Sequence, residues 1–225
     1  MTTAATALPL LGLRIAAGPV ELRGVTDDLL VPLADLAVKG IHDPDFMPFY
    51  TPWSLTPADG MPRAMAQFHW GQRSRFSVER WTADLAVFWE GLLVGCQGFG
   101  AENYLITRTG ETGSWLSREF QGRGIGTAMR QVICAFAIDH LDAESVTSAA
   151  FSDNPASLAV SRKVGYTGNG TERVKRMDRP ATLQRIVLAP ENLVRFEHKL
   201  TVEGLPEFRR SIGLDGSQEH DEIGS

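Results

Sequence analysis

The chain has 225 residues, of which 43% are hydrophobic, and a formal net charge of −5. This length can bury one sizeable core, and the acidic balance gives no basic footprint for nucleic acid or for anionic lipid. Two cysteines, Cys96 and Cys134, are too few for a disulfide framework, so we expect buried thiols and a cytoplasmic protein. No apolar run is long enough to span a bilayer, and the five histidines lack the spacing of metal ligands.

The N-terminal half predicts a strand, two helices and a hairpin. The apolar stretch 8–17 lacks a preceding basic segment, so we do not expect a signal peptide. The predicted elements are a strand at 20–25, a helix at 28–39, an aromatic-rich loop at 41–62, a helix at 62–76, and a hairpin with arms 84–90 and 92–99.

The C-terminal half alternates strands and helices. We predict a strand at 111–116, a helix at 124–140, a strand at 145–151, a helix at 155–165, a basic turn at 175–180 and a strand at 182–189. Asn154 and Pro155 are a helix N-cap and first turn, and Gly165 is a typical C-terminal glycine. We expect one domain, residues 1–214, and a disordered acidic tail, residues 215–225.

The most informative segment is Gln121-Gly122-Arg123-Gly124-Ile125-Gly126, between a predicted strand and a predicted helix. Glycine lets the backbone approach a ligand closely, and the first N–H groups of a helix lack partners within the helix. Together with the helix dipole these groups favour a phosphate or pyrophosphate. A plain glycine-rich turn is the alternative.

The spacing of the glycines excludes two common nucleotide sites. A dinucleotide fingerprint would need glycine at Thr127 or Met129, and a Walker loop would need a Gly-Lys-Ser/Thr ending. The segment instead resembles the acyl-CoA loop of the GNAT superfamily of N-acetyltransferases, Gln/Arg-x-x-Gly-x-Gly/Ala, at Gln121, Gly124 and Gly126.

A second segment strengthens this resemblance. Asn154-Pro155-Ala156-Ser157 followed by Gly165-Tyr166 is similar to the superfamily's second cofactor motif, and the resemblance covers roughly residues 20–187. Trp115-Leu116 before the loop is closest to the Rim-type branch, which acetylates ribosomal-protein N-termini and small amines. The implied fold is α/β (α+β): a mixed, mostly antiparallel sheet with splayed strands, flanked by helices.

The resemblance also implies a set of cofactor contacts. Acetyl-CoA, or another acyl-CoA such as succinyl-CoA, would lie in a cleft between the strands around 113–117 and 145–151. Asn154, Ser157 and Ser161 share one helix face, so we expect that face to meet the cofactor arm. The expected cofactor-binding residues are Leu116, Ser117, Gln121, Gly122, Arg123, Gly124, Ile125, Gly126, Thr127, Asn154 and Ser157.

Two residues are expected to act in catalysis. Glu111 lies on the strand that enters the loop and is the predicted base for the acceptor amine; an exposed strand glutamate is the alternative. Ser161 lies five residues before Tyr166, where many members of the superfamily carry a tyrosine that protonates the leaving thiolate. A serine that bonds only to its own helix is the alternative there. Lone histidines, His42 and His69, are interpreted as packing residues.

The acceptor site is expected in the aromatic loop. Phe46, Phe49 and Trp53 would wall the pocket for a small-molecule or peptide amine, or would form a small core beneath the loop. The implied function is N-acetylation from acetyl-CoA, with N-succinylation or non-catalytic acyl-CoA binding as alternatives. For succinyl-CoA, the candidate cation is Arg108, Arg118 or a residue of the basic turn at 175–180. The apolar residues of 193–208 and the Rim-type resemblance suggest a homodimer.

Overall fold

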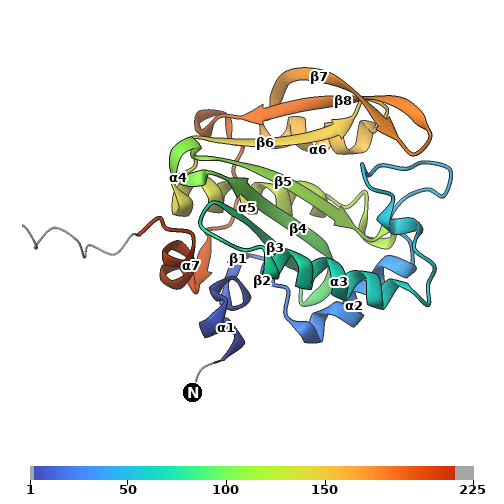
Figure 1. Cartoon of the computed structure of the whole chain (residues 1–225). Coiled ribbons are helices and arrows are strands. Elements are labelled where there is room, and N and C mark those ends of the chain that lie inside the picture. Colours follow the sequence, from blue (N-terminus) through green and yellow to red (C-terminus); the bar gives the residue numbers. More distant parts are fainter. Residues whose placement is uncertain (1–2, 216–225) are drawn as a thin grey trace, which may run out of the picture.

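A single mixed sheet runs through the part of the chain that the computed structural model describes, residues 3–215. Its strand order is β7-β8-β6-β5-β4-β3-β2-β1-β9, and helices cover both faces (Figure 1). The strands are β1 Arg14–Ala17, β2 Val20–Gly24, β3 Arg80–Trp89, β4 Leu92–Glu102, β5 Thr109–Leu116, β6 Ser145–Phe151, β7 Thr167–Arg176, β8 Arg179–Leu188 and β9 Thr201–Glu203.

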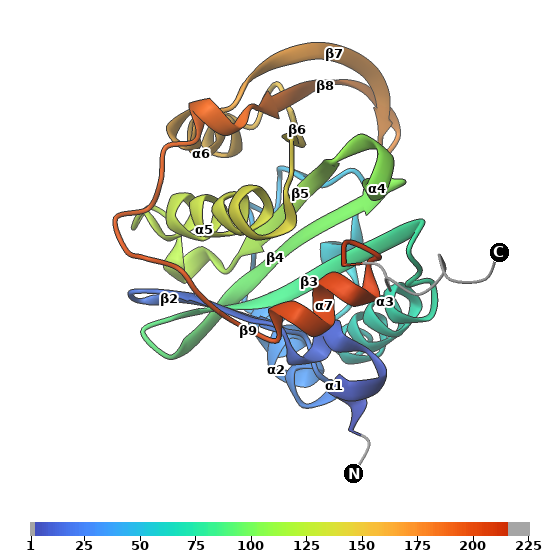
Figure 2. The same cartoon turned by 90° about the vertical axis from the view of Figure 1, so that its left-hand side faces the viewer.

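The helices divide into two groups. One face carries α5 and α6, and the other carries α2 and α3 (Figures 1 and 2). The helices are α1 Ala4–Ala7, α2 Asp27–Val38, α3 Met61–Ser74, α4 Tyr104–Thr107, α5 Ile125–Leu141, α6 Pro155–Val164 and α7 Leu205–Ser211. No helix within residues 3–215 is both long enough and apolar enough to cross a bilayer.

Two clusters of buried side chains follow from this layering. The larger lies between α5 and the sheet, where Val132, Ile133 and Phe136 are fully buried. The smaller lies beneath α2 and α3 and includes Leu33 and Met65. Alternate residues of each strand point to opposite faces, so one strand serves both clusters.

Strands β5 and β6 form the one parallel pair of the described sheet, and their pairing is short. The register joins Thr109–Glu111 to Ser145–Thr147, and no pairing continues beyond it. The neighbouring strands on both sides stay paired antiparallel over longer stretches. The two strands therefore separate after Glu111, which confirms the predicted sheet with splayed strands.

Most predicted elements are present with small shifts in their bounds. The hairpin turn at Glu90-Gly91 is confirmed: both residues have positive φ, 49° and 81°, as a two-residue turn of type I′ requires. Asn154 accepts a hydrogen bond from the Ser157 N–H and caps α6. Gly165 ends that helix with φ 109°.

Several segments differ from the sequence-based expectation. The predicted basic turn at 175–180 is wrong, because only Met177 and Asp178 turn; the flanking residues pair in β7 and β8. Strand β7 is an exposed edge without apolar alternation, so no hydrophobic pattern marked it. The strands β1 and β9 and the short helices α1, α4 and α7 were not predicted.

The C-terminal segment packs onto the same chain. Strand β9 pairs with β1, and Phe208 of α7 is fully buried against Trp81 and Phe136. Asp215, where the tail was predicted to begin, is ion-paired with Arg209. The rest of that tail, residues 216–225, lies outside the described residues, and one domain over 1–214 stays a prediction.

Candidate functional site

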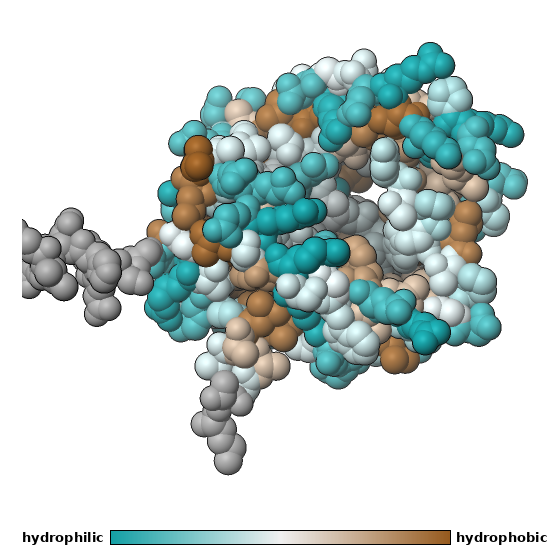
Figure 3. Space-filling model, in the orientation of Figure 1, coloured by the Kyte–Doolittle hydropathy of each residue, from teal (hydrophilic) through white to brown (hydrophobic). Residues whose placement is uncertain are grey.

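A cleft of about 960 Å³ opens where β5 and β6 separate. Its walls come from both splayed strands, from the turn before α5 and from the start of α6. The face seen in Figure 1 is hollowed between the region of β7 and β8 and that of the loop 41–60 (Figure 3). The cleft is thus formed by segments that lie far apart in the sequence.

The start of α5 forms one end of this cleft. Gly124 is the N-cap residue with φ 83°, and Gly122 has φ 74°. A Cβ added at either glycine would meet no protein atom within 4 Å, so both face open space. The first N–H groups of α5 lie at this end and have no partner inside the helix, which suits an anionic group.

Eight of the eleven residues expected to bind a cofactor line this cleft. They are Leu116, Gln121, Gly122, Gly124, Gly126, Thr127, Asn154 and Ser157. Arg123, Ile125 and Ser117 are not among the lining residues. Ile125 is 2% exposed and packs in the core, and the Arg123 guanidinium lies over the ring of Phe120.

The direction of each backbone N–H group of β5 determines whether that group can bind a ligand in the cleft. The Ser117 N–H donates to the Val94 carbonyl of β4, at 2.9 Å, so it is not free for a cofactor. Successive N–H groups of a strand point to opposite edges, which directs those of Leu116 and Ser114 to the open edge. Ser114, which sequence reasoning did not single out, is therefore a better placed donor than Ser117.

Gln121 braces the loop rather than reaching outward. Its side-chain amide donates to the carbonyls of Ile41, at 2.6 Å, and Leu116, at 2.8 Å. These bonds tie the glycine turn to the end of β5 and to the start of the aromatic loop. A glutamine has both the length and the two donors that this bridge needs.

Ser161 is buried at 3% exposure and is not among the residues that line the cleft. Its hydroxyl donates to the carbonyl of Ser157, one turn earlier in α6, at 3.0 Å. This bond is the helix-internal alternative weighed from the sequence. The role of Ser161 as a proton donor stays a prediction that the geometry does not favour.

Arg130 is a cation of the cleft that sequence reasoning missed. It is 5% exposed on α5, and its guanidinium donates to the hydroxyls of Ser114 on β5, at 2.8 Å, and Ser148 on β6, at 3.3 Å. Its Nε–H has no partner, and within residues 3–215 no carboxylate forms an ion pair with Arg130. A buried charge without a counter-ion is costly, which marks Arg130 as a functional candidate. Arg108 and Arg118, the cations considered from the sequence, do not line the cleft.

A second cavity, of about 870 Å³, lies on the α2 and α3 side of β3, β4 and β5. We call it the acceptor groove. It shares Phe49, Glu111 and the strand segment 112–115 with the cleft, so the two cavities meet along β5.

Glycines leave the floor of the acceptor groove without side chains. Strand register aligns Asp84, Gly98 and Gly113 in one row and Thr82, Gly100 and Glu111 in the next. A Cβ at Gly113 would meet nothing within 4 Å, whereas one at Gly98 would meet the Asp84 carboxylate at 3.0 Å. The carboxylate of Asp84 therefore leans over Gly98 toward the middle of the groove.

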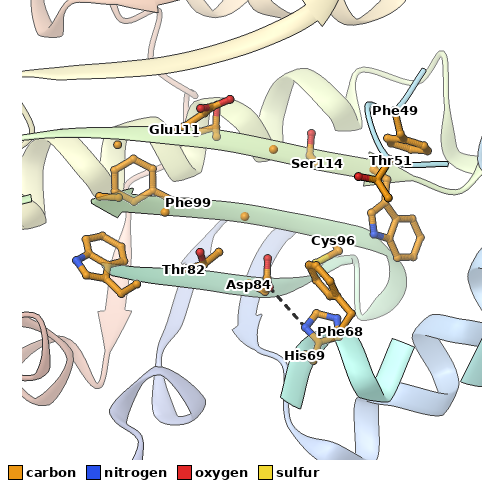
Figure 4. Close-up of a pocket in the computed structure, with 18 of the residues that line it drawn as sticks. Phe49, Thr51, Phe68, His69, Thr82, Asp84, Cys96, Phe99, Glu111 and Ser114 are labelled. Carbon is orange, nitrogen blue, oxygen red and sulfur yellow. Dashed lines mark ion pairs between the residues drawn. The ribbon is translucent and has the colours of Figure 1, made fainter. Parts of the chain in front are cut away.

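Asp84 lies beside His69 of α3, and the dashed line in Figure 4 joins the two side chains. The Nδ1 of His69 lies 3.6 Å from Oδ2 of Asp84, and the two side chains are 4% and 14% exposed. Burial raises the pKa of the Asp84 carboxyl to about 6. Burial, with a smaller contribution from the charge of Arg73, lowers the pKa of His69 to about 4, so this histidine is neutral at pH 7. The packing role expected for His69 omits its contact with this carboxylate.

Glu111 stands at the other side of the same groove, on β5 (Figure 4). Its side chain is exposed, and it is the last residue of β5 before the strands separate. Glu111 therefore lies where the acceptor groove meets the cleft.

The aromatic loop contributes to both cavities. Phe49 and Trp53 line the acceptor groove, while Phe46 lines the cleft and stacks against Arg176. The ring of Trp53 contacts those of Phe49 and Trp115, with centroid distances of 5.3 and 5.7 Å. Phe49 and Trp53 also pack on the smaller core, so these rings support the loop as well as facing the groove.

Within residues 3–215, no three side chains of His, Cys, Asp or Glu gather in a way that could hold a metal ion. The two cysteines, Cys96 and Cys134, are free and buried.

A mixed sheet whose central strands separate above a glycine-rich helix start is the arrangement expected of the GNAT fold. The family model described as "Acetyltransferase (GNAT) domain" matches residues 20–167 of this chain. The chain therefore belongs to the GNAT acetyltransferase-domain family. The match ends at the first residue of β7, so β8, β9 and α7 lie beyond it.

Similarity to a curated relative is local. The chain is 32% identical over 68 residues to YdaF of Bacillus subtilis (strain 168), provisionally described as a ribosomal N-acetyltransferase. The matched part is 30% of this chain and spans 37% of the length of that relative.

Solved structures show the same fold at low identity. Mycobacterium smegmatis RimJ in complex with CoA-disulfide matches 82% of this chain and 88% of its own, with a TM-score of 0.65 at 17% identity. RimL, a ribosomal L7/L12 α-N-protein acetyltransferase in complex with coenzyme A, matches 76% and 94%, with a TM-score of 0.62 at 19% identity.

Proposed function

We propose that this chain is an N-acetyltransferase that moves an acetyl group from acetyl-CoA to a primary amine. The observation that carries the proposal is the cleft between β5 and β6, which ends at the unpartnered N–H groups of α5. The pyrophosphate of CoA would lie at Gly122–Gly126, and the pantetheine arm would run along the open edge of β5.

The chemistry needs a proton acceptor, a donor to the carbonyl oxygen and a means to stabilise the thiolate. In this proposal Glu111 takes the proton of the acceptor amine, and the amine attacks the thioester carbon directly in a ternary complex. The N–H of Ser114 or Leu116 polarises the carbonyl, and the carbon–sulfur bond breaks as the tetrahedral intermediate collapses. Arg130, rather than Ser161, is the better placed group to stabilise the thiolate, because its positive charge already faces the cleft.

The acceptor is the amine of a small molecule or of a peptide N-terminus. Two observations support a peptide acceptor: RimL and YdaF, to which this chain is similar, are described as acting on ribosomal proteins, and the acceptor groove spans three strands with a volume of about 870 Å³. We further propose a cytoplasmic protein, in keeping with the free thiols of Cys96 and Cys134.

A homodimer is also proposed, on the Rim-type resemblance alone. The apolar residues of 193–208 no longer support it, because Phe208 is buried within its own chain. Light scattering would decide the point, and a mass near 24.6 kDa would contradict the dimer.

Donor binding is the first test of the function. Coenzyme A should raise the melting temperature, and the shift should grow with the CoA concentration, because a ligand that binds only the folded state stabilises it by mass action. NADH should give no shift. Gly124→Val should abolish the CoA shift, since its side chain would enter the space of the pyrophosphate.

The matched control is Gly170→Val. Gly170 also has positive φ, 93°, and open space around it, but it does not line the cleft. This variant should lose stability and keep the CoA shift. A shift with NADH and none with CoA would overturn the proposed function.

Succinyl-CoA is a second candidate donor, and Arg130 is the observation that favours it. A guanidinium in the cleft could bind the free carboxylate of a succinyl group. Mass spectrometry of an amine mixture with acetyl-CoA and succinyl-CoA in competition would identify the preferred donor.

A further inference from the structure

The acceptor groove holds two carboxylates, and the proposed reaction uses one of them. Glu111 and Asp84 line the same cavity and belong to strands separated by β4. They lie two strands and two residues apart, which places their Cα atoms about 12 Å from each other. Between them β4 contributes Gly98 and Gly100, and the Thr82 hydroxyl leans over Gly100, where a Cβ would lie 2.8 Å from its Oγ1. A ligand that reaches from one carboxylate to the other therefore passes a short hydroxyl side chain at this point of the floor.

Within residues 3–215, no arginine or lysine forms an ion pair with Asp84. Three groups lie close to it: His69 of α3, Cys96 of the adjacent β4, and Thr82 two residues before it on β3, while the charge of Arg73 of α3 acts on His69. His69 is buried and neutral at pH 7, and the Cys96 thiol has its pKa raised by burial. Arg73 is held by Asp27 and by the carbonyl of Val25, which lie away from the groove.

The two oxygens of Asp84 have different surroundings. Oδ2 is buried beside His69 and accepts no hydrogen bond within residues 3–215, while the carboxylate leans over Gly98 toward the open floor. A buried anion that lacks its counter-ion is costly to the fold. A positively charged group of a ligand would remove that cost.

Other side chains around Asp84 are apolar and would contact the methylene groups of a ligand that carries such a positive charge. Met61, Met65 and Phe68 of α3 and Trp53 of the aromatic loop line the groove on this side. Aromatic faces and methionine sulfur also accept a cation or its attached methylene groups.

We propose that Asp84, which lies beside His69, binds a second cationic group of the acceptor while the amine to be acetylated lies near Glu111. The inference rests on the proposed function, and it names the class of acceptor: a primary amine that carries another positive charge across an apolar spacer. Such an acceptor would be a diamine-like small molecule or a peptide N-terminus followed by a basic side chain.

The test compares pairs of primary amines that have the same shape and differ in whether the far end is charged. Each probe is a primary alkyl amine that ends in a trimethylammonium group, and its control ends in a neutral tert-butyl group, with spacers of graded length. The wild-type enzyme with acetyl-CoA should prefer the charged probe at its best length by at least tenfold in kcat/KM at pH 8. A second arm uses short peptides with lysine or norleucine after the N-terminal residue, which separates a peptide source of the charge from a small-molecule source.

Asp84→Asn keeps the shape of the side chain and removes its charge. In this variant the ratio of kcat/KM for the charged probe to that for the neutral probe should fall to about 1, while kcat/KM for the neutral probe changes little. Glu111→Gln is the matched control: it should lower the rates of both probes alike and keep their ratio. The ratio should also fall as the pH drops through about 6, where the Asp84 carboxyl becomes protonated.

Two results would overturn the inference. One is a wild-type enzyme that acetylates both probes equally well. The other is an Asp84→Asn variant that loses its activity on charged and neutral probes to the same extent, since Asp84 would then be the proton acceptor itself. If no amine is acetylated while CoA still binds, the proposed function fails instead, so the two failures are distinguishable.

Discussion

At the scale of single residues, the acceptor groove contrasts two carboxylates that differ in burial. Glu111 is exposed on β5 where its pairing with β6 ends, whereas Asp84 is buried beside a neutral histidine and has its pKa raised to about 6. Exposure permits Glu111 to release a proton to solvent after it takes one from the amine. Burial makes Asp84 a binding group whose charge depends on pH.

The role of Glu111 predicts a specific kinetic change. Glu111→Gln should lower kcat by about 10²–10⁴-fold, the usual contribution of a general base, and leave CoA affinity nearly unchanged. The loss should shrink at high pH, where more of the amine is already neutral. Ser161→Ala should have a smaller effect, because its hydroxyl is bonded within α6. Full activity of Glu111→Gln at neutral pH would show that another group is the base.

The burial of Asp84 predicts a dependence of stability on pH. Between the ordinary carboxyl pKa of 3.8 and the folded-state value of about 6, the folded protein binds more protons than the unfolded chain. The contribution of Asp84 to stability therefore falls as the pH rises through this window. Asp84→Asn removes this loss, so the variant should be more stable than the wild type at pH 8 by about 1–3 kcal/mol.

Urea unfolding of both proteins at pH 4 and pH 8 checks this sign. The gain should be absent at the lower pH, where the wild-type carboxyl is protonated. His69, with its pKa lowered to about 4, has the opposite dependence between that value and 6.5, but it is present in both proteins and cancels in the difference. Equal or lower stability of the variant at pH 8 would assign Asp84 a stabilising contact instead.

At the scale of elements, α6 is the helix that brings the second half of the cleft into place. Its N-cap, Asn154, lines the cleft, and its C-cap, Gly165, lies against the chain that follows β8. The hydroxyl of the next residue, Tyr166, bonds to Thr112 of β5 at 3.0 Å. Both ends of α6 are therefore tied to the elements around the cleft.

The C-cap of α6 supports a stability prediction. In Gly165→Ala the new Cβ would lie 1.9 Å from the carbonyl oxygen of Asn192, at a residue whose φ is 109°. Backbone would have to shift, so we expect a loss of about 2–4 kcal/mol, above the usual penalty for positive φ. Gly170→Ala is the control, because its φ is similar and its surroundings are open; it should lose about 1–2 kcal/mol. Chemical denaturation measures both, and equal losses would contradict the close contact.

At the scale of the whole molecule, the two ends of the described chain meet at one edge of the sheet. Strand β9 pairs with β1, and α7 follows it, so that Phe208 reaches Trp81 of β3 and Phe136 of α5 (Figure 2). This segment closes the larger core at the side opposite the splayed strands. It stabilises the sheet that positions the cleft without contributing to the cleft itself.

The closure predicts a large effect at a site remote from the chemistry. Phe208→Ala should reduce the free energy of unfolding by about 3–5 kcal/mol, because it removes a fully buried ring from a packed cluster. Ile106→Ala, at a side chain that is 85% exposed, should change it by less than about 0.5 kcal/mol. Thermal or urea unfolding tests the pair, and a small effect at Phe208 would show that the C-terminal segment is dispensable.

The sequence by itself determined the features that depend on neighbours along the chain. The glycine turn before α5, the cap and terminal glycine of α6 and the hairpin at Glu90-Gly91 need only local spacing and the conformational preferences of Gly, Asn and Pro. The two motifs at their separation were enough to indicate the family that the match over residues 20–167 then showed.

Only the tertiary structure decided which side chains share a cavity. Asp84 was an ordinary strand residue until the register of β3, β4 and β5 placed it across a glycine floor from Glu111. In the sequence Arg130 is one polar position on a predicted helix. The structure shows that its guanidinium contacts Ser114 of β5 and Ser148 of β6 where these strands separate. Pairing between distant strands sets these positions, and the register of such pairs depends on packing across the whole sheet rather than on local sequence.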